Sequence, residues 1–488
     1  MASPGPLAEA VLTLCTTVST EQPSLAPELT ATAARLHEPL HLAIAGRVSS
    51  GKSTLVNALL GARVARVGSG ETTAVFTRYL HSEVEDVTLV LRDGSTSPAV
   101  LSTSGTLPPE FGPSDSEIVE VHVRLPYSKI LENLTLIDTP GTSSALNLTS
   151  RGAETLFDSR RRTAPPPDCL LFVLRGREDE ADDLTSFHHL TRGTDLCATN
   201  ALGVITRSDQ LGEPDDPLGA GTRIANRLNS ERVLKPHIGG VIPVIGILAE
   251  AARCRLLRER DLVTLKQLIN VPPTGFGSLQ HLEAVVHDDV ATDDLHRVVG
   301  ILGLHGLRVA VHALRHGCSR PQALMDALLA SSNLPALLEA IDSHFVRRAD
   351  VMKADHALRW LWRLSFRYRD SVGQPLRDAI GRLRATPSMH SVREVWAVSQ
   401  LAEGRTALPG WLEDCLLTVA GPGTLAQRVG CRGARPGEGI ASLARAQAAR
   451  AHEFGSRPTT DATQREIAEV IRRSFTIISE SSHAAGRR

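Results

Sequence analysis

Residues 41–60 read HLAIAGRVSSGKSTLVNALL, and this stretch decides the fold class. The apolar run before Gly46 is typical of a buried strand, and the apolar spacing after Lys52 is typical of a helix. Between them, Gly46 to Ser53 match G-x-x-x-x-G-K-[ST], a pattern in which glycines let backbone N–H groups converge on phosphate oxygens at a helix N-terminus. A strand, this loop and a helix in that order predict a phosphate-binding loop within an α/β domain.

Each side chain of this loop has a predicted task. Lys52 bridges the β- and γ-phosphates of a nucleoside triphosphate, and Ser53 ligates the Mg²⁺ ion that joins those phosphates. A chance match is the alternative, and it is disfavoured because the chain contains only five lysines. The other nucleotide contacts predicted in the loop and the first helical turn are Gly46, Ser49, Ser50, Gly51 and Thr54.

A second motif follows the apolar strand LTLI and reads DTPG at residues 138–141. Asp138 is predicted to hold the Mg²⁺ ion through water, and the backbone amide of Gly141 is predicted to meet the γ-phosphate. The sequence therefore places a metal-binding carboxylate downstream of the phosphate loop.

A third motif follows the strand ALGVI and reads TRSD at residues 206–209. It resembles the [NT]-K-x-D element, whose carboxylate accepts hydrogen bonds from guanine N1–H and N2–H₂. Because adenine offers no such pair of donors, Thr206, Arg207 and Asp209 predict GTP as the nucleotide. The alternatives for Asp209 are a helix cap, or a structural carboxylate in an ATP-dependent enzyme.

The rest of the chain predicts an α/β domain with a mostly parallel sheet, followed by an all-α helical bundle or stalk. Apolar strand candidates alternate with helical segments over residues 38–252, which we assign to the nucleotide-binding domain. Residues 1–37 predict two short helices that join the bundle, and residues 253–488 predict the bundle itself. One apolar stripe is expected to be buried there: Leu334, Leu338, Ile341, Phe345 and Met352.

The composition is that of an ordinary globular protein, with 42% apolar residues, 22% charged residues and a net charge of -1. This balance disfavours nucleic-acid binding. Seven scattered cysteines without a C-x-x-C pair, and no export signal, predict a reduced protein in the cytoplasm. An apolar stretch at residues 238–252 is too short for a bilayer span, so any membrane contact is expected to be peripheral.

These motifs, in this order, resemble those of bacterial dynamin-like GTPases, and the layout is similar to the isoniazid-inducible dynamin-like proteins of actinobacteria. The resemblance covers most of the chain and is strongest in residues 41–251. It rests on these segments: GRVSSGKSTLVNALLG (46–61), GETTAVFTR (70–78), LTLIDTPGT (134–142), ITRSD (205–209) and VIPVIGILAEAA (241–252).

The resemblance implies further roles. Thr73, with Thr72 as the alternative, is expected to bind Mg²⁺ and position the attacking water, and Ser49 to help place a monovalent cation. Lys52, Ser49 and Thr73 are thus the expected catalytic residues, and Ser53, Thr73 and Asp138 the metal-binding ones. The family also implies membrane binding or remodelling, and pairing through the GTPase domain with a second copy or another dynamin-like protein.

Three residues depart from the dynamin pattern: Val48 stands in place of a polar residue, Arg207 in place of a lysine, and Ile245 in place of a small residue. They motivate an alternative function, a catalytically weak guanine-nucleotide-binding scaffold that partners another dynamin-like protein. GTP binding is expected to survive these changes better than hydrolysis.

Two other segments have a structural interpretation that competes with a functional one. Residues 358–369 combine aromatic and basic side chains, and either contact anionic lipid or form a bundle helix that buries Leu358, Leu361, Trp362 and Phe366; the spacing favours the helix. The acidic residues between 178 and 183, with the histidines at 188–189, lack metal-site spacing and are expected on a solvated surface.

Overall fold

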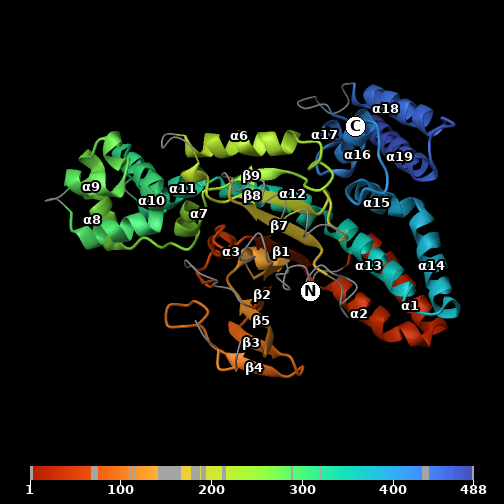
Figure 1. Ribbon diagram of the computed structural model, residues 1–488, viewed down its shortest axis with the longest axis horizontal. Coiled ribbons are helices and arrows are strands. Elements are labelled where there is room, and N and C mark those ends of the chain that lie inside the picture. Colours follow the sequence, from red (N-terminus) through yellow and green to blue (C-terminus); the bar gives the residue numbers. More distant parts are fainter. Residues whose placement is uncertain are drawn as a thin grey trace.

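A nine-stranded sheet forms the centre of the computed structural model, with the order β4-β3-β5-β2-β6-β1-β7-β8-β9 (Figure 1). The structure describes residues 4–66, 75–108, 111–113, 117–140, 166–176, 187, 194–211, 216–286, 290–318, 320–430 and 439–485. The strands are β1 (Leu40–Gly46), β2 (Phe76–His81), β3 (Asp86–Leu91), β4 (Thr96–Ala99), β5 (Ile118–Leu125), β6 (Leu134–Asp138), β7 (Cys169–Leu174), β8 (Ala201–Ile205) and β9 (Val241–Pro243).

The sheet is mostly parallel around β1. Strands β6, β1, β7, β8 and β9 run in the same direction, and β1 lies between β6 and β7. Strand β2 pairs antiparallel with β6, and β3 is antiparallel to both β4 and β5. Residues in β1, β6, β7 and β8 are buried along their whole length, as expected for parallel strands covered on both faces. The predicted fold class, a mostly parallel α/β domain with a large helical part, is confirmed.

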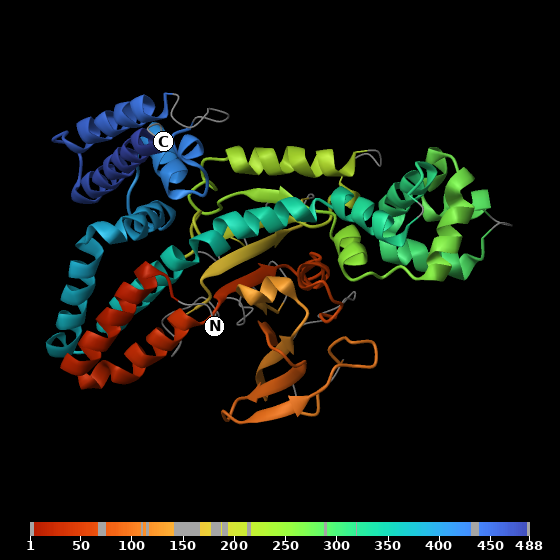
Figure 2. The same ribbon diagram turned by 180° about the vertical axis from the view of Figure 1, so that it is seen from behind.

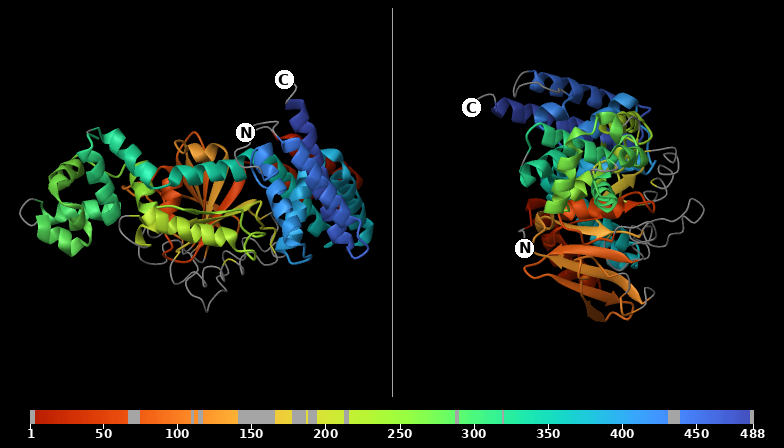
Figure 3. Two further views of the ribbon diagram at one scale, coloured as in Figure 1. Left: turned by 90° about the horizontal axis from the view of Figure 1, so that it is seen from above. Right: turned by 90° about the vertical axis from the view of Figure 1, so that its left-hand side faces the viewer.

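Helices cover the sheet and extend from both of its ends (Figure 3). Those before and within the sheet region are α1 (Pro6–Glu21), α2 (Ala26–His37), α3 (Lys52–Leu60), α6 (Pro217–Ser230) and α7 (Gly246–Arg253). The later ones are α8 (Glu259–Gln267), α9 (Leu279–Val286), α10 (Thr292–Arg315), α11 (Pro321–Ser331), α12 (Leu334–His344), α13 (Ala349–Ser365), α14 (Asp370–Ala385), α15 (His390–Ala402), α16 (Gly410–Ala420), α17 (Leu425–Arg428), α18 (Ile440–Gly455) and α19 (Ala462–Ala485).

Helix α12 packs on the sheet, although its residues fall within the segment predicted as stalk. Leu334, Leu337, Ile341 and Phe345 share one apolar core with β1, β6 and α3. Figure 2 shows α12 running across the back of the sheet, from α11 to α13. The predicted apolar stripe is therefore largely buried, against strands rather than against other bundle helices. Leu338 lies at its edge and is only partly buried.

Helices α8 to α11 form a lobe at one end of the sheet with its own apolar core, which also includes residues of α7. Within the described residues, α10 is long and apolar enough to cross a membrane, with a mean hydropathy of 1.3. Helix α11 and the helical segment Leu334–Ser365 that follows it meet at a bend of 64°, and the two together are also long and apolar enough for one span. The sequence predicts helices in this region, but not an apolar helix of this length, because histidines and arginines interrupt the apolar run. Leu295, Val298 and Leu302 of α10 are core residues of the lobe.

At the other end, α1 and α2 pack on α13 and α14 around a shared apolar core. Asp168, just before β7, joins this bundle to the sheet and is almost fully buried. Its carboxylate accepts hydrogen bonds from the Arg35 guanidinium of α2 and the His41 backbone N–H, the latter at 2.8 Å. Its other oxygen lies 2.7 Å from His356 Nδ1 on α13. This junction of charged groups is called the Asp168 junction below.

The aromatic and basic segment at residues 358–369 forms the end of α13, but its predicted pattern of burial was partly wrong. Leu358 and Leu361 are buried as expected, together with Trp360. Trp362 and Phe366 are 37% and 61% exposed, and their rings pair edge to face at 5.7 Å. The reason is that α13 is surrounded by α1, α2, α14 and α15, so a single stripe does not describe its buried surface.

Candidate functional site

The predicted phosphate loop begins where β1 ends, at the middle of the parallel part of the sheet. Ser49 and Gly51 have φ angles of 58° and 88°, in the left-handed region. Two left-handed residues within three positions produce the tight curl that a loop around phosphate requires. A Cβ atom on Gly46 would lie 2.7 Å from the Val173 carbonyl oxygen, so only glycine fits against β7 at this position.

Lys52 and Asp138, predicted from two separate motifs, lie together in the structure. Both are buried, and Lys52 Nζ is 3.7 Å from Asp138 Oδ1. Asp138 is placed by the register of β6, which sets it opposite Ile44 of β1. The next residue fixes this arrangement, because the Thr139 backbone N–H and hydroxyl donate to the Ile44 carbonyl at 3.2 and 3.0 Å. A cation and a carboxylate thus meet at the mouth of the loop.

The loop residues fit a bound triphosphate with Mg²⁺. Ser50 Oγ is buried and has no hydrogen-bond partner in the described part of the chain, so a donor is left for a ligand oxygen beside Lys52. Ser53 and Thr54 occupy the first turn of α3 and are partly buried. The described residues contain no group of three or more His, Cys, Asp or Glu side chains that holds a metal. Of the predicted Mg²⁺ ligands, Ser53 and Asp138 lie among the described residues and Thr73 does not.

The third predicted motif also reaches the phosphate loop. The Thr206 hydroxyl donates to the Ser50 carbonyl, and a Cβ on Gly51 would lie 3.0 Å from Thr206 Oγ1. Arg207 pairs with Ile245 in an isolated bridge, and Asp209 begins the next turn in the 3₁₀ segment Ser208–Gln210. The structure thus joins the end of β8 directly to the loop after β1.

Helix α10 reaches the same motif at a kink that the sequence analysis did not anticipate. Gly303 has φ 67° and ψ 172° inside α10, and a Cβ atom there would lie 4.0 Å from Asp209 Oδ2. It would also lie 3.9 Å from the side chain of Ile247 in α7. The lobe formed by α8 to α11 therefore borders the carboxylate that was predicted to read guanine.

Other predicted residues lie outside the described part of the chain. They include Thr73, its alternative Thr72, and Gly141, so their roles stay predictions. The acidic residues between 178 and 183 and the histidines at 188–189 also lie outside it.

Val48 and Ile245, two of the positions that depart from the dynamin pattern, both form contacts with described residues. The Val48 carbonyl accepts a hydrogen bond from the guanidinium of Arg175, which follows β7. Ile245 is fully buried in the core shared by α7, α10 and α11, and its backbone N–H donates to the Ser332 carbonyl at 2.9 Å. The Ile245 side chain therefore contributes to the packing of this core. The sequence analysis gave Arg175 no role. Its position directly after a buried strand could have indicated that it lies near the phosphate loop.

Asn57 is a second residue that the sequence analysis missed. It is fully buried on α3, where its Oδ1 accepts from the N–H groups of Val64 and Ala65 at 3.0 and 2.8 Å. Its Nδ2 donates to the Ala65 carbonyl and, at 2.7 Å, to Glu250 on α7. Burial raises the pKa of the Glu250 carboxyl. Asn57 thus connects the helix of the phosphate loop with α7 and with the segment that leads into residues 67–74.

Comparison with known proteins supports the same region of the chain. Residues 42–207, which contain β1, the phosphate loop and the end of β8, match the dynamin family. The chain carries a dynamin-family domain. The match begins in β1 and ends at Arg207, so it spans all three predicted motifs up to the middle of the last one.

Similar proteins occur in mycobacteria. Isoniazid-induced protein IniC of Mycobacterium tuberculosis is 29% identical over 335 residues, which are 67% of this chain and 66% of that protein. The chain thus spans just under two thirds of that relative. Isoniazid-induced protein IniA of the same organism is 35% identical over 130 residues, 25% of this chain and 20% of that protein.

A solved structure is also similar. It is described as an oligomerised bacterial dynamin pair that provides a mechanism for the long-range sensing and tethering of membranes. It is 13% identical and covers 99% of this chain and 77% of its own, at a TM-score of 0.30. A likeness at that score bears no weight for the function of this chain.

Proposed function

We propose that this protein binds GTP with Mg²⁺ and hydrolyses it. The observation that carries the proposal is the contact of Thr206 with Ser50, which brings a guanine-reading motif onto a phosphate loop. The ion pair of Lys52 with Asp138 adds a cation and a metal-binding carboxylate at the same place. One nucleotide that spans these groups explains why three motifs far apart in sequence converge on one edge of the sheet.

In this proposal the chain's own groups bind and orient the nucleotide. Backbone N–H groups of the curled loop and the N-terminus of α3 hold the phosphates, and Lys52 offsets charge on the β- and γ-phosphates. Ser53 and Asp138 hold the Mg²⁺ ion, which supplies further charge compensation during phosphoryl transfer. Thr73 positions water, Gly141 contacts the γ-phosphate, and Ser49 places a monovalent cation.

Nucleotide state is proposed to act on the helical part of the chain. Helix α3 packs on α7, and α7 packs on α10 and α11. Helix α12 continues from there across the sheet to α13 and the bundle of α1, α2 and α14. A change at the phosphate loop therefore has a continuous packed route to both ends of the molecule. For a dynamin-family protein we propose peripheral membrane binding or remodelling from the cytoplasmic side, with pairing through the nucleotide-binding domain.

The test is Mg²⁺-dependent phosphate release from GTP by the whole chain. Lys52→Ala should reduce release by at least about 100-fold, because it removes charge stabilisation at the transferred phosphate. Asp209→Asn should weaken GTP binding by about 10- to 100-fold and improve binding of xanthosine triphosphate, because an amide donates where the carboxylate accepted. Arg405→Gln, on an exposed side chain with a single surface ion pair, is the matched control. Unchanged release from Lys52→Ala would contradict the assignment of this site.

The scaffold alternative stays open because of Val48 and Arg207. Arg175 donates to the carbonyl of Val48, so a guanidinium is held at the rim of the phosphate loop where the family carries a polar side chain. If the chain binds GTP in the manner that Asp209→Asn tests but releases no phosphate, also in the presence of vesicles, it acts as a guanine-nucleotide-binding scaffold. Phosphate release that is lost in Lys52→Ala shows instead that the chain is an enzyme.

A further inference from the structure

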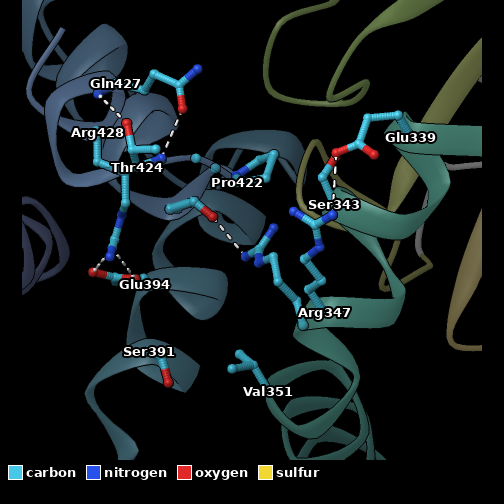
Figure 4. Close-up of a pocket in the computed structure, with 14 residues that line it drawn as sticks. Glu339, Ser343, Arg347, Val351, Ser391, Glu394, Pro422, Thr424, Gln427 and Arg428 are labelled. Atoms are coloured by element: carbon cyan, nitrogen blue, oxygen red, sulfur yellow. Dashed lines mark hydrogen bonds and ion pairs between the residues drawn. The ribbon is translucent and has the colours of Figure 1, made fainter. Parts of the chain in front are cut away.

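A cavity of about 640 Å³ lies where α12, the α12–α13 connection and helices α15 to α17 meet. Figure 4 shows Arg428 and Glu394 on the side of the C-terminal helices, Arg347 and Glu339 on the side of α12, and Pro422 between them. Cavities of 300–1,000 Å³ at such junctions are typical of small-molecule sites. None of these residues belongs to the nucleotide site.

Arg348 lines this cavity and brings a positive charge that Glu394 offsets only in part, without a direct ion pair. Its guanidinium donates to the Ala420 carbonyl at 2.6 Å and to the Thr199 carbonyl at 3.5 Å, and it forms no ion pair with any described residue. Burial lowers the pKa of this guanidinium, and the nearby Arg428 adds to the effect although Glu394 opposes it. A partly buried cation held only by carbonyl groups is a costly arrangement that a bound anion would relieve.

The other charges of the cavity are already paired. Arg428 contacts both oxygens of Glu394 at 2.9 and 3.0 Å, and Arg347 pairs with Glu339 and with Asp342 outside the cavity. Of the three arginines that line the cavity, Arg348 is the one that forms no ion pair with a described residue.

A glycine-containing loop completes the wall opposite Arg348. Residues Gly421 to Thr424 line the cavity between α16 and α17. Neither the Gly421 nor the Gly423 backbone N–H donates to a protein acceptor in the described part of the chain, and Gly423 has φ 136°. Backbone N–H groups in such turns are common ligands of anions. A second cavity, of about 710 Å³, adjoins the same loop beyond Pro422, which leaves room for the rest of a larger ligand.

We propose that this cavity binds a phosphate monoester between Arg348 and the loop from Gly421 to Thr424. A guanidinium and free amide donors match the several acceptor oxygens of a phosphate, and the negative charge supplies the partner that Arg348 lacks. Because Arg348 already contacts the sheet side at Thr199 and α16 at Ala420, the ligand holds these parts together. The phosphate belongs either to a soluble molecule or to a lipid headgroup.

The first arm of the experiment uses inorganic phosphate and isothermal titration of the whole chain. It is done in the Lys52→Ala background, so that the phosphate loop does not contribute. Saturable binding with a stoichiometry of one is expected, weakened at least tenfold by Arg348→Gln. Ser391→Phe, which narrows the cavity with an apolar ring but keeps Arg348, should also weaken it. Arg405→Gln, on an exposed arginine far from the cavity, should not change it.

The second arm separates the two sources of phosphate by sedimentation with vesicles of phosphatidylcholine alone or with phosphatidic acid. Retention only with phosphatidic acid, lost in Arg348→Gln and Ser391→Phe, supports a lipid headgroup, and saturable binding of free phosphate without retention supports a soluble ligand. The proposal is overturned if neither arm shows binding, or if the cavity variants bind as well as Arg405→Gln. GTP turnover of Arg348→Gln, measured with Lys52 intact, is expected to persist. Folding of each variant is checked by its thermal transition.

Discussion

The phosphate loop and the Asp168 junction both lie at the ends of central strands, yet they are assembled in opposite ways. The phosphate loop takes its curl, its lysine and its helix start from consecutive residues, 46–54. The Asp168 junction takes its partners from Arg35 on α2, His41 on β1 and His356 on α13. Local backbone specifies the first, whereas only the folded chain brings the second together.

The phosphate loop and the Asp168 junction also differ in what stabilises them. A glycine loop is stable because its backbone conformation suits its residues, and it leaves polar groups for a ligand. A buried carboxylate needs every partner at once, since removing one leaves an uncompensated charge. Burial alone would raise the pKa of Asp168, but the Arg35 guanidinium and the hydrogen bond from His356 outweigh it and hold this pKa well below its usual range. The Asp168 junction is therefore expected to carry more of the stability.

The largest effect is expected for Asp168→Ala. The substitution leaves the buried His356 without its carboxylate and leaves Arg35, whose side chain is 12% exposed, with Glu38 at 3.6 Å as its remaining ion-pair partner among the described residues. The loss is expected to cost about 3–5 kcal/mol in the free energy of unfolding. Asp86→Ala is the matched control, because Asp86 and Arg124 form an exposed ion pair worth about 1 kcal/mol or less. Denaturant unfolding of both variants checks the prediction. Equal losses in the two would show that the Asp168 junction is no stronger than a surface pair.

The same experiment has a pH signature. Because the pKa of Asp168 is lowered by folding, its contribution is complete above its ordinary value of 3.8 and is lost as the pH falls below that value. The difference in stability between the wild type and Asp168→Ala should therefore shrink in acid. A difference that stays constant down to low pH would assign the loss to packing instead of charge.

A smaller effect is expected for Asn57→Ala, which tests whether the phosphate-loop helix also depends on distant partners. Asn57 makes four hydrogen bonds, to Val64, Ala65 and Glu250, and their loss should cost about 2–3 kcal/mol. The control is Asn229→Ala, since exposed Asn229 bonds only the two backbone groups of Val241. Thermal or denaturant unfolding measures both. If Asn57→Ala costs no more than the control, the phosphate loop and its helix are stabilised by residues close in the sequence and do not depend on distant partners.

The contiguous parts of the molecule were predictable from sequence. The alternation of apolar strands and helices gave the mostly parallel sheet, and each motif at a strand end was recognised by its own residues. The structure adds the contacts between them, such as Lys52 with Asp138 and Thr206 with Ser50, which the sequence implied only through a shared ligand. The roles of Thr73 and Gly141 remain predictions.

The parts that escaped prediction depend on tertiary packing. The apolar stripe of α12 was correctly recognised as buried, but periodicity does not tell whether a sheet or a bundle covers it. Trp362 and Phe366 were expected inside because a single stripe was assumed, whereas α13 is packed on several sides. No role was predicted for Asp168 or Arg348, since their partners are far away in the sequence.

The smallest effect is expected where a distant helix borders the base-reading motif. Gly303→Ala places a side chain at φ 67° and ψ 172°, a conformation essentially restricted to glycine, which costs roughly 1–2 kcal/mol, although its Cβ meets Asp209 and Ile247 only at ordinary contact distance. Gly300→Ala, one turn earlier in α10 at a helical position with nothing within 4 Å, should instead stabilise the protein by about 0.5–1 kcal/mol. Opposite shifts in thermal stability are therefore expected from the same substitution. If Gly303→Ala also weakens binding of GDP and Gly300→Ala does not, the kink of α10 is part of the base site. If both substitutions stabilise the protein, the kink is not required, and the base site is formed without α10, from residues close together in the sequence.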